Sequence, residues 1–104
     1  MAERRRATRR ERERTRRRLA QEIEELARLE EGGSPARPIP IDSAAVVEVR
    51  ALARSCPLCG GPTRLAAHTA EVIDGVRLRV AAVACTMCGV ERAIYFRLDE
   101  PPVH

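Results

Sequence analysis

Two short cysteine motifs constrain the fold of this chain more than any other feature. The first runs from Cys56 to Gly61 and the second from Cys85 to Gly89. In each motif two cysteines three positions apart are followed by glycine, so a tight turn can aim both sulfurs and nearby N–H groups at one ion. The pattern predicts one structural Zn²⁺ per chain, held by four thiolates. The predicted ligands are Cys56, Cys59, Cys85 and Cys88.

Other uses of four cysteines fit less well. Disulfides need an oxidising compartment, and no apolar signal segment precedes residue 40, so the expected location is the reducing cytoplasm. A thioredoxin-like redox site uses a single C-x-x-C pair on a βαβ scaffold, and this chain has two pairs and no such pattern. Iron stays open as a minority occupant, since rubredoxin-like proteins also use two knuckles. Their aromatic cores contrast with Tyr95 and Phe96, the only aromatic residues of this chain.

The length of the chain favours a domain stapled by metal. Its 104 residues allow one small domain plus an extension, and the low aromatic content limits the hydrophobic core. Binding of a structural zinc supplies roughly 10–16 kcal/mol of apparent free energy, the scale that a ribbon of this size needs. No apolar run is long enough to cross a bilayer, so we expect a soluble protein without a membrane partner.

Charge is distributed very unevenly along the chain. Residues 1–18 hold ten arginines against three glutamates, a net of +7, whereas residues 19–31 hold one arginine against five glutamates, a net of −4. Arg, Glu, Ala and Leu are good helix formers, Thr8 with Glu11 fits a capping box, and Gly32-Gly33 supplies a stop. The sequence therefore predicts a charged helical arm over residues 1–33, with an apolar stripe only in its second half.

The segment after the arm is less clearly defined. Three prolines predict a linker over residues 34–45, before a ribbon domain over residues 46–104. Within Ala44–Ala53, helix and strand compete. The charged residues Glu48, Arg50 and Arg54 share one face at period two, which favours an extra strand over Val46–Leu52.

Three further strands are predicted around the cysteine motifs. Thr63–Ile73 and Val76–Ala84 flank Asp74-Gly75, a strong signal for a two-residue hairpin turn. A strand over Glu91–Leu98 follows the second motif. Pairing Ile73 with Val76 places one set of hairpin residues on one face: Leu65, Ala67, Ile73, Val76, Leu78 and Val80. The opposite face would carry His68, Arg77 and Arg79. In the third strand, Ile94, Phe96 and Leu98 point one way, with Phe96 in the core and Tyr95 partly exposed.

This order of knuckle, hairpin, knuckle and strand resembles the zinc ribbon superfamily over residues 54–98. The resemblance rests on Cys-Pro-x-Cys-Gly-Gly at the first knuckle and Cys-x-x-Cys-Gly at the second. The chain is also similar to small uncharacterised bacterial proteins in which a four-cysteine ribbon follows a charged leader. The resemblance implies a three-stranded, metal-stabilised β domain with metal ligation by the four cysteines. It implies no single function, since zinc ribbons serve many roles.

The sequence argues against an enzyme and against a small-molecule substrate. A catalytic zinc keeps an open coordination position, whereas four thiolates close the shell. His68 lacks the following glutamate that zinc deaminases use, and lies mid-strand as a partly exposed surface histidine. The glycines form no phosphate loop.

Two binding functions remain. In the first, guanidinium groups of the arm and the ribbon contact DNA or RNA phosphate. The candidate contact residues are Arg4, Arg5, Arg6, Arg9, Arg10, Arg16, Arg17, Arg18, Arg77 and Arg79. In the second, the chain is a docking module without a nucleic-acid role, whose stripe of Leu19, Ile23 and Leu26 meets a protein partner or its own copy.

Overall fold

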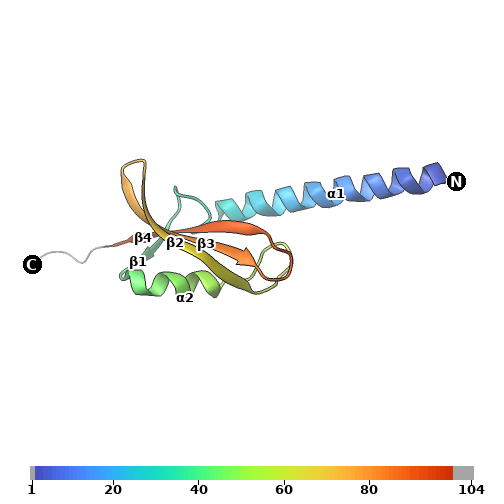
Figure 1. Ribbon diagram of the computed structural model, residues 1–104. Coiled ribbons are helices and arrows are strands. Elements are labelled where there is room, and N and C mark those ends of the chain that lie inside the picture. The colour runs from blue at the N-terminus through green and yellow to red at the C-terminus, as the bar shows by residue number, and fades with distance from the viewer. Residues whose placement is uncertain (1, 100–104) are drawn as a thin grey trace, which may run out of the picture.

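The computed structural model describes residues 2–99, with side chains from Thr8 onward, and joins one long helix to a four-stranded sheet (Figure 1). The fold is the expected small β domain with an N-terminal charged helix, but its sheet has four strands and not three. The elements in chain order are α1 (Ala2–Leu29), β1 (Ile39–Ile41), a 3₁₀ turn η1 (Ala44–Val46), α2 (Val47–Leu52), β2 (Thr63–Ile73), β3 (Val76–Cys85) and β4 (Glu91–Leu98).

Helix α1 begins earlier than the capping signal predicts. Because the helix starts at Ala2, Thr8 lies in its interior and is not its N-cap. Arg, Glu and Ala carry the helix through this region, where Gly and Pro do not occur. The helix ends at Leu29, and the predicted stop follows as Gly32 with a left-handed φ of 83°. Between residues 2 and 99, no helix is both long and apolar enough to span a membrane.

The sheet follows the order β1-β4-β3-β2. Strands β2 and β3 form the predicted hairpin, with Ile73 paired to Val76 and with Asp74 and Gly75 at φ of 50° and 78°. Both values lie in the left-handed region that a type I′ turn requires. Strand β4 pairs antiparallel with β3 and parallel with β1. The three strands expected around the cysteine motifs are confirmed to within one residue at each end.

The core lies on the face of the sheet that α2 covers. Ala81, Val83, Ile94 and Phe96 are buried there, together with residues of β1 and α2. Phe96 is the largest of the fully buried side chains, as the strand pattern predicts. The register pairs Arg79 with Phe96, so the core face is the one that carries Arg79. Leu78 and Val80, which alternate with Arg79 along β3, therefore lie on the other face of the sheet, away from Phe96.

A register shift between Leu65 and Ala67 corrects a second detail of the hairpin. Leu65 pairs with Val83, whereas Ala67 pairs with Ala82, so one extra residue of β2 interrupts the ladder. A bulge of this kind moves the preceding side chains to the other face of the strand. Leu65 consequently packs against the core cluster and does not share a face with Ala67.

The strand predicted over Val46–Leu52 is wrong, because this segment is η1 followed by α2. Ser43 caps η1, since its hydroxyl accepts a hydrogen bond from the N–H of Ala45. Val47 and Ala51 are both fully buried. Residues four apart lie on the same face of a helix, so α2 buries both side chains at once. The alternation of the charged residues is therefore a weaker guide to this segment than the spacing of its buried residues.

The extra strand of the sheet is β1, which lies inside the segment predicted as a linker. Ile39 and Ile41 are buried against the core while Pro40 between them is exposed. Proline is tolerated here because β1 is an edge strand that pairs only with β4. The division into arm, linker and ribbon domain stays a prediction.

Candidate metal centre and charged arm

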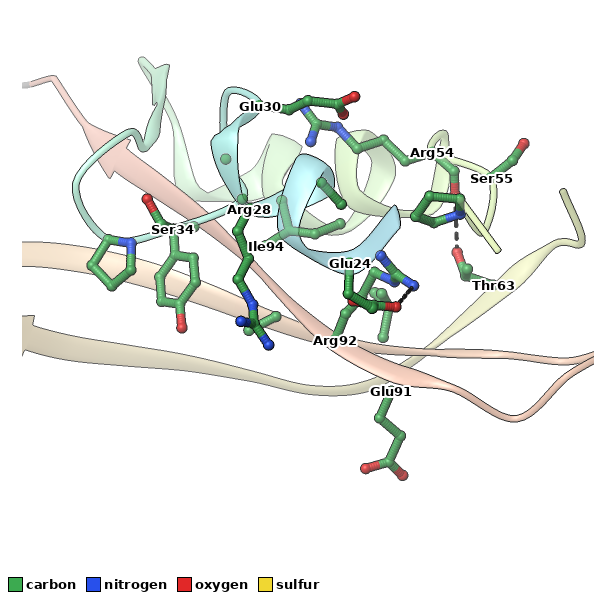
Figure 2. A pocket seen from close by; sticks show the side chains of 18 residues that line it. Glu24, Arg28, Glu30, Ser34, Arg54, Ser55, Thr63, Glu91, Arg92 and Ile94 are labelled. Carbon is green, nitrogen blue, oxygen red and sulfur yellow. Dashed lines mark hydrogen bonds and ion pairs between the residues drawn. The ribbon is translucent and has the colours of Figure 1, made fainter. Parts of the chain in front are cut away.

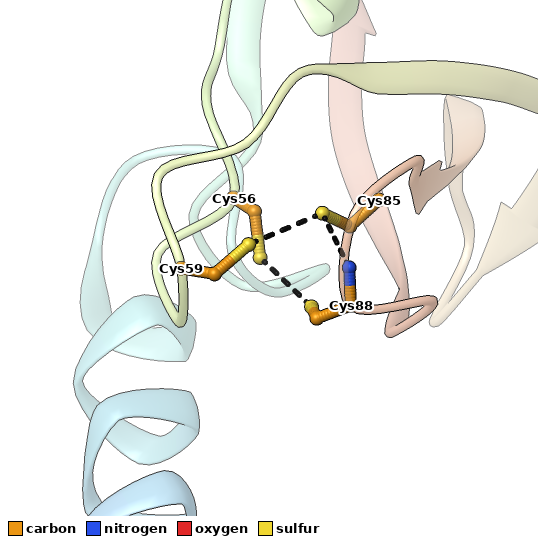
Figure 3. Close-up of side chains that lie close together, drawn as sticks. All are labelled: Cys56, Cys59, Cys85 and Cys88. Atoms are coloured by element: carbon orange, nitrogen blue, oxygen red, sulfur yellow. Dashed lines mark hydrogen bonds between the residues drawn. The ribbon is translucent and has the colours of Figure 1, made fainter.

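The structure brings the four cysteine sulfurs into one cluster (Figure 3). All four Sγ atoms lie within 4.8 Å of one another. Across the two knuckles, Cys56 Sγ is 3.7 Å from Cys88 Sγ, and Cys59 Sγ is 3.4 Å from Cys85 Sγ. A tetrahedral zinc with zinc–sulfur bonds of about 2.3 Å has sulfur–sulfur edges of about 3.8 Å. The four cysteines are therefore placed to bind one metal ion.

Each knuckle is a turn closed by its own backbone. Gly60 and Gly89 have left-handed φ values of 75° and 77°, which favour glycine. The N–H of each glycine donates to the carbonyl of the first cysteine of its knuckle, over 2.7 Å to Cys56 and 3.1 Å to Cys85. The two knuckles thus share one backbone geometry. Glycine follows each cysteine pair because the turn needs a left-handed φ at that position.

The hairpin and one further contact bring the two knuckles together. Strand β2 leaves the first knuckle and β3 returns to the second, with Thr63 paired to Cys85 at the base. Thr86 donates to the carbonyl of Pro62 from both its N–H and its hydroxyl, each over 2.9 Å. Sheet pairing at the base of the hairpin and the contact of Thr86 with Pro62 therefore place the two knuckles side by side.

Hydrogen bonds and burial shift the pKa values of Cys56, Cys59 and Cys85 in different directions. The N–H of Cys88, opposed by partial burial, lowers the pKa of Cys85 to about 6. Burial raises the pKa of Cys56, but backbone hydrogen bonds outweigh it and the pKa is lowered. At Cys59 the N–H of Gly61 lowers the pKa, yet the Cys85 sulfur and burial raise it to about 11. The pKa of one cysteine in each knuckle, Cys56 and Cys85, is thus lowered, and a bound dication would offset the repulsion among four thiolates.

The arginines predicted to contact nucleic acid fall into two separate groups. Arg9, Arg10, Arg16, Arg17 and Arg18 are exposed on α1. The side chains of Arg4, Arg5 and Arg6 lie outside the described residues.

The ribbon arginines form the second group. Arg77 is exposed and Arg79 half-buried at the start of β3, next to the hairpin turn. In Figure 1 the hairpin turn and the N-terminal half of α1 lie at opposite ends of a molecule 76 Å long. The structure does not bring the two groups together.

The second half of α1 is attached to the ribbon by contacts that the sequence analysis missed. Arg92 Nη2 of β4 donates to Glu24 Oε1 over 2.6 Å, with side chains only 14% and 26% exposed (Figure 2). Arg37 donates to the carbonyl of Leu29, and the N–H of Tyr95 donates to the carbonyl of Gly32. A cleft of about 660 Å³ lies between the end of α1, the first knuckle and β4. Of the hydrogen bonds named here, the Glu24–Arg92 pair joins α1 directly to β4, and the other two lie where the chain leaves the helix.

The predicted apolar stripe of the arm is divided by this attachment. Ile23 is half-buried, together with Ala20 and Ala27. Leu19 and Leu26 remain 52% and 62% exposed. Only part of the stripe is therefore open to a partner.

His68 is more enclosed than a surface histidine. Its side chain is 16% exposed, and Nδ1 lies 3.6 Å from Glu48 Oε1 of α2. Its Nε2 atom has no hydrogen-bond partner among the described residues. Helix α2 carries Glu48 and brings it beside His68. The sequence analysis missed this contact because it expected a strand over these residues.

Comparison with protein-family models, with curated proteins and with solved structures finds no match to this chain. The class that the structure defines is a small β domain, with an N-terminal helix, a four-stranded mixed sheet and a four-cysteine cluster suited to a metal ion.

Proposed function

We propose that the chain is a non-enzymatic zinc ribbon that associates with nucleic acid through its arginine-rich arm. Zinc is the proposed metal because four thiolates at these sulfur distances suit its size and tetrahedral preference. Four protein ligands complete the shell and leave no coordination position for a substrate, which supports a structural role for the metal. The ribbon then serves as a rigid base for the arm.

The observation that carries the nucleic-acid proposal is the exposure of the arm. Between residues 8 and 18 every side chain is exposed, and this stretch holds seven arginines against two glutamates. Arginine forms bidentate contacts with phosphate, and a helix that is basic on all sides can follow a groove without a preferred face. The Glu24–Arg92 ion pair supports this role because it fixes the arm to the ribbon at its far end.

A truncation tests the proposal directly. A chain that starts at Leu19 should keep its zinc and its fold but lose most affinity for a generic duplex. An arm that contacts about four to six phosphates predicts a slope of log affinity against log salt near −4 to −5, falling toward about −1 after truncation. Fluorescence anisotropy with a labelled duplex at several salt concentrations measures both quantities.

A matched pair of variants separates charge from side-chain bulk. Changing Arg9, Arg10, Arg16 and Arg17 to glutamate should reproduce the loss, whereas changing the same four to lysine should retain most of the salt slope. An intact chain that binds neither duplex nor RNA at low salt overturns the proposal.

Protein docking is the second candidate, favoured by the exposure of Leu19 and Leu26 on the arm. Partner capture from the native cell, with and without nuclease, distinguishes the two functions. Partners lost on nuclease treatment support nucleic-acid association, and partners retained support docking.

A further inference from the structure

The two edges of the sheet differ in how well they are protected. The edge at β1 is three residues long and carries Pro40, which offers no N–H to a further strand. The edge at β2 is eleven residues long and contains no proline, and among the described residues β2 pairs only with β3. The ion pair of α1 is made with Arg92 of β4, two strands away from β2. Strand β2 is therefore the edge at which a further strand can add.

The two-residue turn between β2 and β3 determines which backbone groups of this edge are free. In such a hairpin the flanking pair, Ile73 and Val76, exchanges both of its hydrogen bonds, and bonded pairs recur at every second residue. Thr69 and Glu71 therefore point their N–H and C=O groups toward β3. The alternate residues point theirs outward, where no strand within residues 2–99 meets them. These outward residues are His68, Ala70 and Val72.

We propose that β2 pairs in antiparallel orientation with β2 of a second copy of this chain, with Ala70 opposite Ala70 at the two-fold axis. His68 of each copy then lies opposite Val72 of the other, so every outward residue of one edge meets an outward residue of the other. Other registers lose part of this match. Centring the pair on Thr69 sets Val72 against Ala66, where the bulge interrupts β2, and centring it on Glu71 sets His68 against the turn.

A second copy is the occupant because the side chains of this edge also match their own reversal. Thr69 of each copy lies opposite Glu71 of the other on the face away from α2, so a hydroxyl can donate to a carboxylate across the new pair. Val72, which is 69% exposed, gains a neighbour in His68 of the second copy. The small side chain of Ala70 leaves the axis uncrowded. In this register no two like charges lie opposite each other.

The resulting dimer has one continuous sheet, in which the two β2 strands lie at the centre and the short β1 strands at the two ends. The inference does not rest on the identity of the metal or on nucleic acid. A chain found to be monomeric leaves the nucleic-acid proposal standing, because the arm can contact a duplex without a second copy.

Hydrogen exchange of the full zinc-loaded chain, measured for single amides by NMR, gives the first test. The amides of His68, Ala70 and Val72 should become protected as protein concentration rises, in step with the molecular mass from sedimentation equilibrium. The amides of Thr69 and Glu71 should be protected at every concentration, because they bond to β3. A monomer at all concentrations, or a dimer whose three outward amides stay unprotected, overturns the proposal.

Charged substitutions at Thr69 test the register. Thr69→Arg places a guanidinium opposite Glu71 of the second copy and should lower the dissociation constant, whereas Thr69→Glu should raise it. Each change should be roughly 2- to 30-fold, because the pair occurs twice. A register centred on Thr69 would set each new charge against itself and weaken the dimer in both variants. Dissociation constants that change in the same direction therefore overturn the proposal.

Matched controls place the same charges elsewhere. Thr15→Arg and Thr15→Glu lie at an exposed position of α1 and should leave the dissociation constant unchanged.

A proline tests the backbone contact itself. Because the N–H of Ala70 faces away from β3, Ala70→Pro removes no hydrogen bond within the hairpin. It should raise the dissociation constant at least about tenfold, since it removes a donor from each copy at the centre of the pair. Ala70→Val keeps the N–H and should still dimerise. Zinc content and circular dichroism check that both variants are folded, and an Ala70→Pro dimer as strong as that of Ala70→Val overturns the proposal.

Discussion

The two cysteines of each knuckle occupy different surroundings. Cys56 and Cys85 are buried, whereas Cys59 and Cys88 are exposed at the surface of the cluster. Substitution of a buried cysteine changes both ligation and packing. Substitution of an exposed one changes ligation with little effect on packing, so Cys59 and Cys88 are the informative positions.

Cys59→Ser should lower the zinc content well below one per chain and unfold most of the ribbon. Three remaining sulfurs cannot complete the tetrahedron, and metal binding of this kind supplies roughly 10–16 kcal/mol of apparent folding free energy. Elemental analysis and circular dichroism of the purified variant measure the two effects. Met87→Ser is the matched control, because Met87 lies in the other knuckle, is exposed and carries no ligand. A folded, metal-free chain at neutral pH would contradict the assignment.

At this scale the sequence predicts the clustering of the four cysteines and misses the ion pairs. Ligands of one metal occur in short motifs whose spacing is visible along the chain. The Glu24–Arg92 pair joins residues 68 positions apart, and each has many oppositely charged alternatives. Pairing of that kind depends on the tertiary fold, and no local pattern encodes it.

Among the elements, the β2–β3 hairpin could be predicted from the sequence and α2 could not. Asp74-Gly75 fixes a turn through its own backbone preferences, so the strands on either side follow. Helix α2, Val47–Leu52, is only six residues long. A helical pattern of apolar residues cannot be recognised over so short a segment, so the alternating charges favoured a strand. Strand β1 was missed because Pro40 indicates a linker, and its partner β4 is more than fifty positions away.

Gly75→Val should destabilise the ribbon by roughly 1–2 kcal/mol, the cost of a left-handed conformation for a residue with a side chain. Gly75 has a φ of 78°, and nothing lies within 4 Å of an added Cβ, so conformation and not collision sets the cost. Thermal unfolding of the zinc-loaded variant measures the loss. Asp74→Asn is the control, since asparagine tolerates the φ of 50° at that position. An unchanged melting temperature would show that the turn lies elsewhere.

For the molecule as a whole, the direction of the arm depends on a few contacts at one corner. The Glu24–Arg92 pair holds the helix from the side, and Gly32 and Gly33 lie where the chain turns toward β1. A Cβ on Gly33 would approach the carbonyl oxygen of Ala27 to 2.1 Å. Glycine is therefore required for the close approach at this corner.

Arg92→Ala should loosen the arm while leaving the metal site intact. The hydrogen bond joins two charged, mostly buried groups, and bonds of this type contribute roughly 1.5–3 kcal/mol. Hydrogen exchange of the amides in residues 19–29 should accelerate correspondingly. Arg64→Ala, an exposed arginine of β2, is the control and should leave exchange unchanged. Equal protection in both variants would show that the ion pair does not hold the arm.

The arm is one unbroken helix, and its second half carries the Glu24–Arg92 contact with the ribbon. The number of residues between that contact and the arginines therefore sets the direction in which the arginines point around the helix axis. Each residue of an α-helix adds about 100° of rotation and 1.5 Å of rise. An alanine inserted between Arg18 and Leu19 would turn every arginine of the basic half by that angle about the helix axis and leave the attached half in place. Seven inserted residues would restore the original direction at about 10 Å greater reach. The direction of the arginines around the helix axis and their distance from the ribbon can thus be changed by insertion, without altering the domain that carries the arm.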